Sequence, residues 1–166
     1  MPAKKLDARI QLLVDVAEQA YHTRAWHGTN LRGSLRGLSI DEALWRPGSR
    51  RHNIWEIALH TAYWKYTVWR KLTGAEIGGF PREGSNFPAL PETPDMKHWK
   101  KDLALMRKTH LDFIEAIRGF SARKLEQKPP KLKFPWKEYI YGVASHDLYH
   151  AGQIQLLKRL CRNAKD

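Results

Sequence analysis

The segment TPDMKHWKKDLALMRKTHLDFIEAIRG, residues 93–119, gives the clearest indication of the fold. Its large side chains recur in steps that alternate between three and four residues, which is the spacing of a helix in a bundle. The stripe consists of Met96, Trp99, Leu103, Met106, His110, Phe113 and Ile117. Thr93 and Pro94 are suited to the start of this helix, as its cap and its first residue, and Gly119 to its end. We therefore predict one long helix that buries a single face.

Three other stretches show the same helical period. They run from about Leu6 to Arg24, from His52 to Leu72 and from Pro135 to Arg162. Between the first two, Thr29 is placed to cap a short helix, and the sequence SIDE at residues 39–42 matches a capping box that opens another. Four amphipathic helices of about 20 residues are typical of a four-helix bundle, so we predict an all-α fold.

The longest connector, AEIGGFPREGSNFPALPET at residues 75–93, is rich in glycine and proline. It lies between the second and third long helices and is long enough to cross the bundle, so successive helices need not alternate in direction. Connectors of this length without secondary structure usually have a function or are mobile. The chain length of 166 residues favours a single domain over residues 1–166, with a long crossover connection between helices two and three.

The chain is strongly basic, with 29 Lys and Arg against 17 Asp and Glu and a net charge of +12. Such a charge is compatible with a polyanionic partner. The basic residues are nevertheless interleaved with acidic ones, and the densest cluster, KPPKLKFPWK at residues 128–137, lies in a connector without a nucleic-acid-binding motif. Charge alone is weak support for nucleic-acid binding, which we therefore rank as a third hypothesis.

Other features concern the cellular compartment. The single cysteine, Cys161, excludes an intramolecular disulfide and is typical of a reducing compartment. The first residues lack the apolar core of a secretory signal, and no run approaches the roughly 18 apolar residues of a membrane span. We expect a cytoplasmic protein without a membrane segment.

Histidines occupy unusual positions on the predicted helices. Four of the eight fall on core-facing stripes, namely His60, His110, His146 and His150. His146 and His150 are separated by about 400° of helix, so both imidazoles lie on one face and can reach one ion. His60, in the middle of the second long helix, is the natural third ligand. Spacing alone leaves open a metal site and ordinary packed histidines, and the pattern lacks the glutamate of the zinc-protease motif HExxH.

Two longer stretches extend this pattern. The sequence WHGTNLRGSLRGLSIDEALWRPGSRRHNIWEIALHTAYWKY, residues 26–66, together with SHDLYHAGQI, residues 145–154, resembles the DinB family. The likeness covers about residues 7–160, and WEIALHTAYW and HDLYHAGQI are its most specific parts. A homodimer is among the family's expected properties. The resemblance also implies a four-helix bundle that binds a divalent ion, Ni²⁺ or Zn²⁺, through His60, His146 and His150.

The same resemblance implies several alternative functions. The leading hypothesis is a metal-dependent enzyme that uses a low-molecular-weight thiol for S-transfer to a small-molecule substrate. Metal-assisted hydrolysis is the second enzymatic alternative, since a bound ion acidifies water as well as thiols. A non-catalytic binding protein of the stress or DNA-damage response is the alternative from another class.

Two residues outside the histidine triad are candidates for a catalytic role. Glu56 lies one turn before His60 on the same face, as a candidate general base or as an acceptor for an imidazole N–H. A first-turn acid favoured by the helix dipole is the alternative interpretation. His27 lies in the WHG break between helices, where it is placed either to line the mouth of a pocket or to cap a helix.

Other side chains are candidates for contacts with the ligands or the substrate. Gln153 can hydrogen-bond a ligand or a substrate, and Trp64, one turn after His60, can form a pocket wall. Asp147 can orient a ligand histidine or form a surface ion pair. We interpret His110 as a packed residue that is hydrogen-bonded across the bundle. Surface or helix-end positions are expected for His22, His52 and His98.

Overall fold

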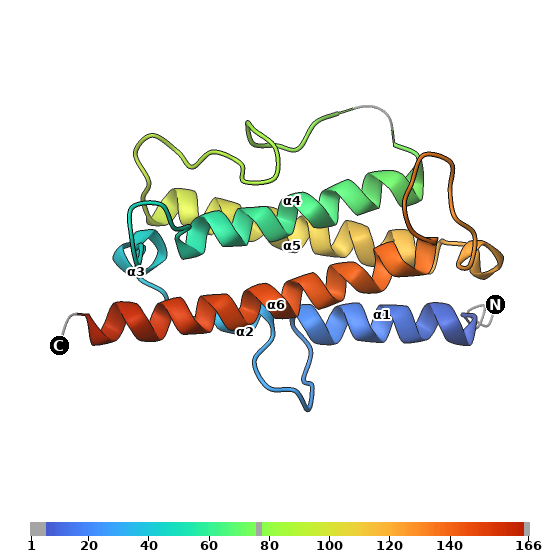
Figure 1. Cartoon of the computed structure of the whole chain (residues 1–166), viewed down its shortest axis with the longest axis horizontal. Coiled ribbons are helices and arrows are strands. Elements are labelled where there is room, and N and C mark those ends of the chain that lie inside the picture. The colour runs from blue at the N-terminus through green and yellow to red at the C-terminus, as the bar shows by residue number, and fades with distance from the viewer. Residues whose placement is uncertain (1–5, 76–77, 165–166) are drawn as a thin grey trace.

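The computed structural model describes residues 6–75 and 78–164, and every regular element among them is helical. Four long helices lie side by side and form a bundle (Figure 1). They are α1 (Ala8–Tyr21), α4 (Ile54–Thr73), α5 (Met96–Arg118) and α6 (Trp136–Asn163). The connections contain α2 (Leu31–Ser34), α3 (Ile40–Leu44) and the 3₁₀ helix η1 (Ala122–Lys124). The predicted all-α bundle is confirmed.

Several helix starts are set by side chains that accept hydrogen bonds from free backbone N–H groups. The predicted capping box at residues 39–42 is present at the start of α3. Two other predicted caps were wrong: Asp95 rather than Thr93 caps α5, and Asn30 rather than Thr29 caps α2. In both cases a carboxylate or amide oxygen, which reaches the backbone N–H groups of the first turn well, takes the capping position.

The bundle contains two pairs of parallel helices. α4 and α5 start at the same end and run in the same direction, whereas α1 and α6 run the opposite way (Figure 1). Near the shared start, the Trp55 indole of α4 donates to the Asp102 carboxylate of α5 at 2.8 Å. The segment of residues 78–95, here called the crossover segment, runs back along the bundle toward the start of α5. Arg82 anchors it through an ion pair with the same Asp102.

Each long helix packs mainly against two others. α1 and α4 both pack against α5 and α6, so α1 and α4 occupy one diagonal of the bundle. The α4–α6 edge and the α1–α5 edge are therefore opposite edges. The apolar core fills the space between the helices, from Trp55 and Trp99 toward one end to Phe113 and Ile140 toward the other.

A buried ion pair interrupts this apolar core. The Lys65 ammonium of α4 lies 2.6 Å from the Asp147 carboxylate of α6, and each side chain is only 2% exposed. The same ammonium lies over the Tyr21 ring of α1, 4.5 Å from its centroid. Burial raises the pKa of the Asp147 carboxyl, and the charge of Lys65 opposes that shift. The ionic partner of Asp147 is thus a core lysine, which contradicts the surface ion pair that was one of the two alternatives for Asp147.

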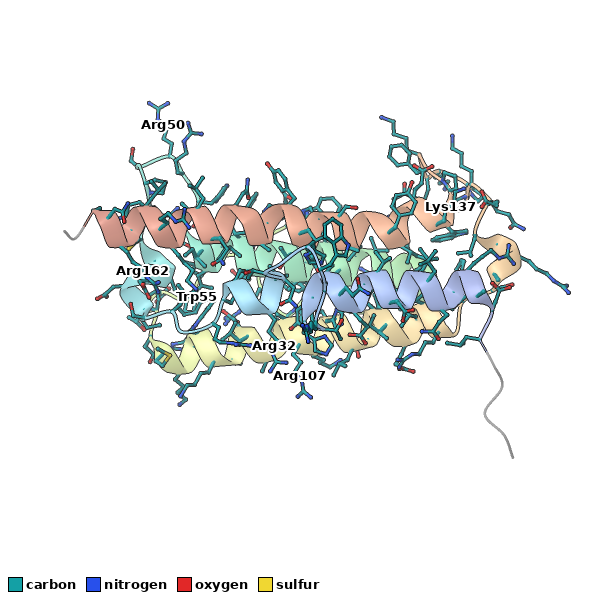
Figure 2. The ribbon with its side chains drawn as sticks, turned by 90° about the horizontal axis from the view of Figure 1, so that it is seen from below. Arg32, Arg50, Trp55, Arg107, Lys137 and Arg162 are labelled. Atoms are coloured by element: carbon teal, nitrogen blue, oxygen red, sulfur yellow. The ribbon has the colours of Figure 1, made fainter. Side chains whose placement is uncertain are left out.

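The positive charge of the surface is spread widely. Figure 2 shows Arg50, Lys137 and Arg162 at separate places around the bundle, whereas Arg32 and Arg107 lie close together. Arg32 and Arg107 line one groove with Arg36 and Lys100. Some are paired locally, as Arg162 is with Glu42 at 2.8 Å. Within the described ranges, no helix combines the length and apolar character needed to cross a membrane.

Candidate metal centre

The three predicted metal ligands lie together between α4 and α6. His60 comes from the middle of α4, and His146 and His150 follow each other by about one turn on α6. The Nε2 atom of His146 lies 3.0 Å from that of His60 and 3.0 Å from that of His150. His60 and His150 are 7% and 6% exposed, so water reaches this cluster only from a restricted side.

Acceptors beside Nδ1 determine which tautomer His60 and His150 adopt. His60 Nδ1 lies 2.7 Å from the backbone carbonyl of Asn86, and His150 Nδ1 lies 2.7 Å from the side-chain oxygen of Gln153. A carbonyl oxygen only accepts, so both Nδ1 atoms carry the single hydrogen of a neutral ring. The Nε2 atoms of His60 and His150 then direct lone pairs toward His146.

This arrangement of hydrogens favours a cation among the three rings. If His146 carries a hydrogen on Nε2, it can donate that hydrogen to only one of its two neighbours, His60 or His150. The Nε2 lone pair of the other neighbour then lies 3.0 Å from His146 Nε2 without a hydrogen between them. Protonation of one of the rings is unfavourable near neutral pH, because burial lowers the pKa of His146 to about 3 and that of His150 to about 4. Burial also lowers the pKa of His60. Three neutral imidazoles are instead a donor set for Zn²⁺ or Ni²⁺, so the residues fit the predicted ion.

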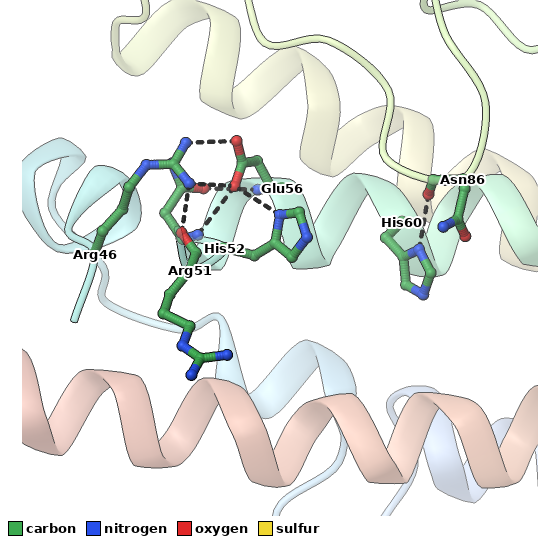
Figure 3. Close-up of polar contacts among 7 residues, drawn as sticks. Arg46, Arg51, His52, Glu56, His60 and Asn86 are labelled. Atoms are coloured by element: carbon green, nitrogen blue, oxygen red, sulfur yellow. Dashed lines mark hydrogen bonds and ion pairs between the residues drawn. The ribbon is translucent and has the colours of Figure 1, made fainter. Parts of the chain in front are cut away.

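The crossover segment holds His60 in place from outside the bundle. Asn86, with a positive φ of 63°, directs its carbonyl to His60 and accepts from the Trp64 indole through its side-chain oxygen at 2.8 Å. The next residue, Phe87, stacks on the His60 ring at a centroid distance of 4.2 Å and on the His52 ring at 3.7 Å. Figure 3 shows Asn86 reaching His60 from this segment. Two adjacent loop residues thus fix the tautomer and the plane of one ligand.

Gln153 performs the corresponding task for His150. Replacing Gln153 by alanine should weaken metal binding by roughly 10- to 100-fold, as loss of an outer partner does at comparable sites. Gln155→Ala is the matched control, because Gln155 has the same chemistry on the same helix but contacts Thr29. Competition with a metal-binding dye measures both affinities. Equal affinities of the two variants would contradict this role of Gln153.

Glu56 is engaged at the start of α4. Its carboxylate accepts from the Arg46 guanidinium at 2.5 and 2.8 Å and lies 3.1 Å from His52 Nδ1 (Figure 3). It also completes a capping box with Asn53. Burial works to raise the pKa of Glu56, but hydrogen bonds to the carboxylate, that from Arg46 foremost, outweigh it and lower the pKa. The geometry supports the first-turn acid, and the imidazole that Glu56 contacts is His52 rather than a triad ring.

A cavity of about 580 Å³ opens beside the triad. Figure 3 shows Arg51, which lines it, extending toward α6 from the loop that precedes α4. Among the described lining residues there is no aspartate or glutamate. Apolar and aromatic side chains form much of the wall: Pro47, Ile57, Phe87, Tyr149, Leu156 and Leu157. A small molecule with an apolar part can therefore approach the three histidines from this side.

Two predicted pocket residues lie outside this cavity. His27 belongs to an exposed loop after α1, and its neighbour Trp26 is 96% exposed. The loop does not form the cavity mouth, because the lining comes from α4, α6, the loop before α4 and the crossover segment. Trp64 lines a separate hollow of about 230 Å³ next to His146 and acts on the triad through Asn86.

Sequence reasoning missed His52, Asn86 and Phe87. The pattern N-x-x-E at residues 53–56 is readable as a capping box, and it would have indicated that Glu56 is engaged at a helix start. His52 directly precedes that box, so the same pattern places it beside the Glu56 carboxylate. Asn86 and Phe87 lie in a segment without periodicity, and no local signal brings them to His60.

The fold and the site together define a helical-bundle protein with a three-histidine site suited to a divalent ion. Residues 16–154, most of the chain, match the model of the DinB superfamily. The chain belongs to the DinB superfamily, which confirms the resemblance drawn from its motifs. Comparison with curated proteins and with solved structures gave no match.

Proposed function

We propose that this chain is a metal-dependent enzyme that transfers a low-molecular-weight thiol to a small electrophilic substrate. His60, His146 and His150 would hold the ion, with Ni²⁺ and Zn²⁺ as the leading candidates. The observation that carries the proposal is the convergence of three Nε2 atoms, with those of His60 and His150 each 3.0 Å from that of His146 and with their lone pairs directed inward. When bound, such an ion supplies positive charge that acidifies a thiol or a water molecule.

The cavity suits a thiol better than water as the nucleophile. No carboxylate among its described lining residues is available as a general base, and Glu56 is held by Arg46. A thiol has an ordinary pKa of about 8.5 and ionises readily beside positive charge. Water is a much weaker acid and depends more on a base. We therefore place thiol transfer before metal-assisted hydrolysis.

The residues of the chain shape the space in which the transfer takes place. Phe87 and Leu157 form an apolar wall beside the nucleophile, and Arg51 brings positive charge to the cavity. The sulfur forms a bond to the electrophilic carbon while the bond from that carbon to its leaving group breaks. The leaving group takes that electron pair, and the thiol proton passes to solvent through the open side of the cavity.

The proposal also places the enzyme in the cytoplasm. Low-molecular-weight thiols are kept reduced there, and proteins of that compartment generally lack disulfides. The single cysteine, Cys161, is buried as a free thiol, which agrees with this placement.

An activity assay tests this proposal. Purified protein loaded with Ni²⁺ or Zn²⁺ is incubated with each of a panel of thiols and with a chlorinated nitroaromatic substrate. We expect thiol-dependent product that disappears on chelation, returns with added metal and is lost in His60→Ala. Gln155→Ala should retain full activity, since Gln155 does not line the cavity. Metal binding without turnover on any thiol would favour the non-catalytic protein, and ester hydrolysis without thiol would favour the hydrolase.

A further inference from the structure

We propose that the chain holds a second divalent-cation site, formed by Glu18, His22 and His110. Glu18 and His22 come from the last turn of α1 and the residue that follows it, and His110 comes from the middle of α5. The cluster therefore lies on the α1–α5 edge of the bundle, opposite the α4–α6 edge that carries the triad. It does not depend on the proposed thiol chemistry.

The three side chains converge as metal ligands do. Glu18 Oε2 lies 3.0 Å from His22 Nδ1 and 3.1 Å from His110 Nε2, and the three ligand atoms all lie within 4.8 Å of one another. Ligand atoms around a four-coordinate Zn²⁺ with bonds of 2.0–2.2 Å are about 3.4 Å apart. Shifts of exposed side-chain torsions are enough to reach that spacing, because Glu18 and His22 lie at the helix end. Two imidazoles and one carboxylate are also an established donor set for zinc.

His110 is the buried ligand of the proposed site, and packing fixes the position of its ring. The His110 side chain is 1% exposed, and its ring stacks on Tyr21 at a centroid distance of 3.9 Å and an angle of 18°. Burial lowers the pKa of His110 to about 2, so its ring is neutral as a ligand must be. Its Nδ1 atom is buried without a hydrogen-bond partner among the described residues. Metal binding through Nε2 places the ring hydrogen on Nδ1, where no acceptor lies among the described residues, and this offsets part of the binding free energy.

The other two ligands leave the site open on one side. The side chains of Glu18 and His22 are 20% and 33% exposed, and both line a groove of about 270 Å³ on the surface of α1. Asp15 and Arg118 line the same groove, and Arg118 is paired with Glu115 at 2.6 Å. Three protein ligands with an accessible fourth position match an open zinc-type site, in which water completes the coordination. An ion bound there would link α1 to α5.

Zinc stoichiometry separates the two sites. Metal-free protein is equilibrated with a small excess of Zn²⁺, and the bound metal is measured by titration calorimetry and by elemental analysis after gel filtration. We expect two equivalents for the wild type, one for His22→Asn, one for Glu18→Gln and one for His146→Ala. The double variant His22→Asn/His146→Ala should bind none. His98→Asn is the matched control, since His98 is also a partly exposed histidine paired with a nearby acid, Asp95, and it should bind two equivalents.

Thermal unfolding gives a second readout that does not rely on counting. In the His146→Ala background, Zn²⁺ should raise the Tm through the second site alone, and adding His22→Asn should abolish that rise. His22 is exposed, so circular dichroism of the metal-free variants should match the wild type. A single equivalent in the wild type that disappears in His146→Ala would overturn the second site and leave the triad intact. Retention of two equivalents in both His22→Asn and Glu18→Gln would overturn it as well.

Discussion

Replacing His146 by alanine should abolish tight metal binding at the triad. Its Nε2 atom is the common point of both 3.0 Å contacts, to His60 and to His150, so its loss removes the centre of the donor set. We expect a loss of affinity well beyond the roughly 10- to 100-fold that removal of an outer partner causes. Dye competition with Ni²⁺ and with Zn²⁺ measures the affinity, and the tighter class of binding should disappear.

His27→Ala is the control for this experiment. His27 lies in an exposed loop and does not line the cavity beside the triad, so its loss should leave metal affinity unchanged. A weaker affinity in His27→Ala, with unchanged affinity in His146→Ala, would refute the assignment of the ligands.

Replacing Lys65 by methionine should destabilise the fold by about 3–5 kcal/mol. The substitution leaves the Asp147 carboxylate 2% exposed and without its 2.6 Å ionic partner. One oxygen of that carboxylate, Oδ1, already lacks a hydrogen-bond partner among the described residues, so no second donor compensates. Urea unfolding followed by circular dichroism measures the free energy of unfolding. Chelator is present throughout, because bound metal would add its own stabilisation.

The double variant Lys65→Met/Asp147→Leu tests the cause of that loss. Replacing a buried pair by apolar residues of similar size is often neutral or stabilising by about 1–4 kcal/mol, so the double variant should recover the stability of the wild type. Lys108→Met is the surface control, since Lys108 is 72% exposed beside Asp112 and its pair should contribute about 0–1 kcal/mol. A loss in Lys65→Met no greater than that of Lys108→Met would show that Asp147 needs no buried partner.

Periodicity predicted the apolar face of α5 well. Trp99, Met106, Phe113 and Ile117 are all buried, as their spacing required, and His110 makes the predicted contact across the bundle with Glu18. Leu103 is only half-buried, and the prediction was wrong for Met96, which is 40% exposed in the first turn of the helix. Asp147 shows where the same reasoning fails. It follows His146 by about 100° of helix, and its burial depends on a lysine that another helix delivers. An ion pair between helices that are far apart in the sequence cannot be predicted from the residue spacing of either helix.

The candidate metal ligands could be predicted because helical spacing and the family motifs point to the same three histidines. His146 and His150 share a face by local geometry alone, and His60 could be chosen because it lies in the middle of a second amphipathic helix. The residues that position His60 could not be predicted from the sequence. Asn86 and Phe87 act through a backbone carbonyl and a ring stack, and both depend on the path of the crossover segment rather than on a residue pattern.

The crossover segment also bears on the order in which the site assembles during folding. Asn86 is 26 residues from His60 along the chain, whereas His146 is 86 residues from it. Closing the longer loop costs about 1 kcal/mol more in chain entropy, and α6 leaves the ribosome after the crossover segment. We expect the first histidine to be oriented by a near neighbour in sequence before the last helix arrives. The remaining two ligands then come as one preformed pair, so the metal-binding surface is completed in a single docking event.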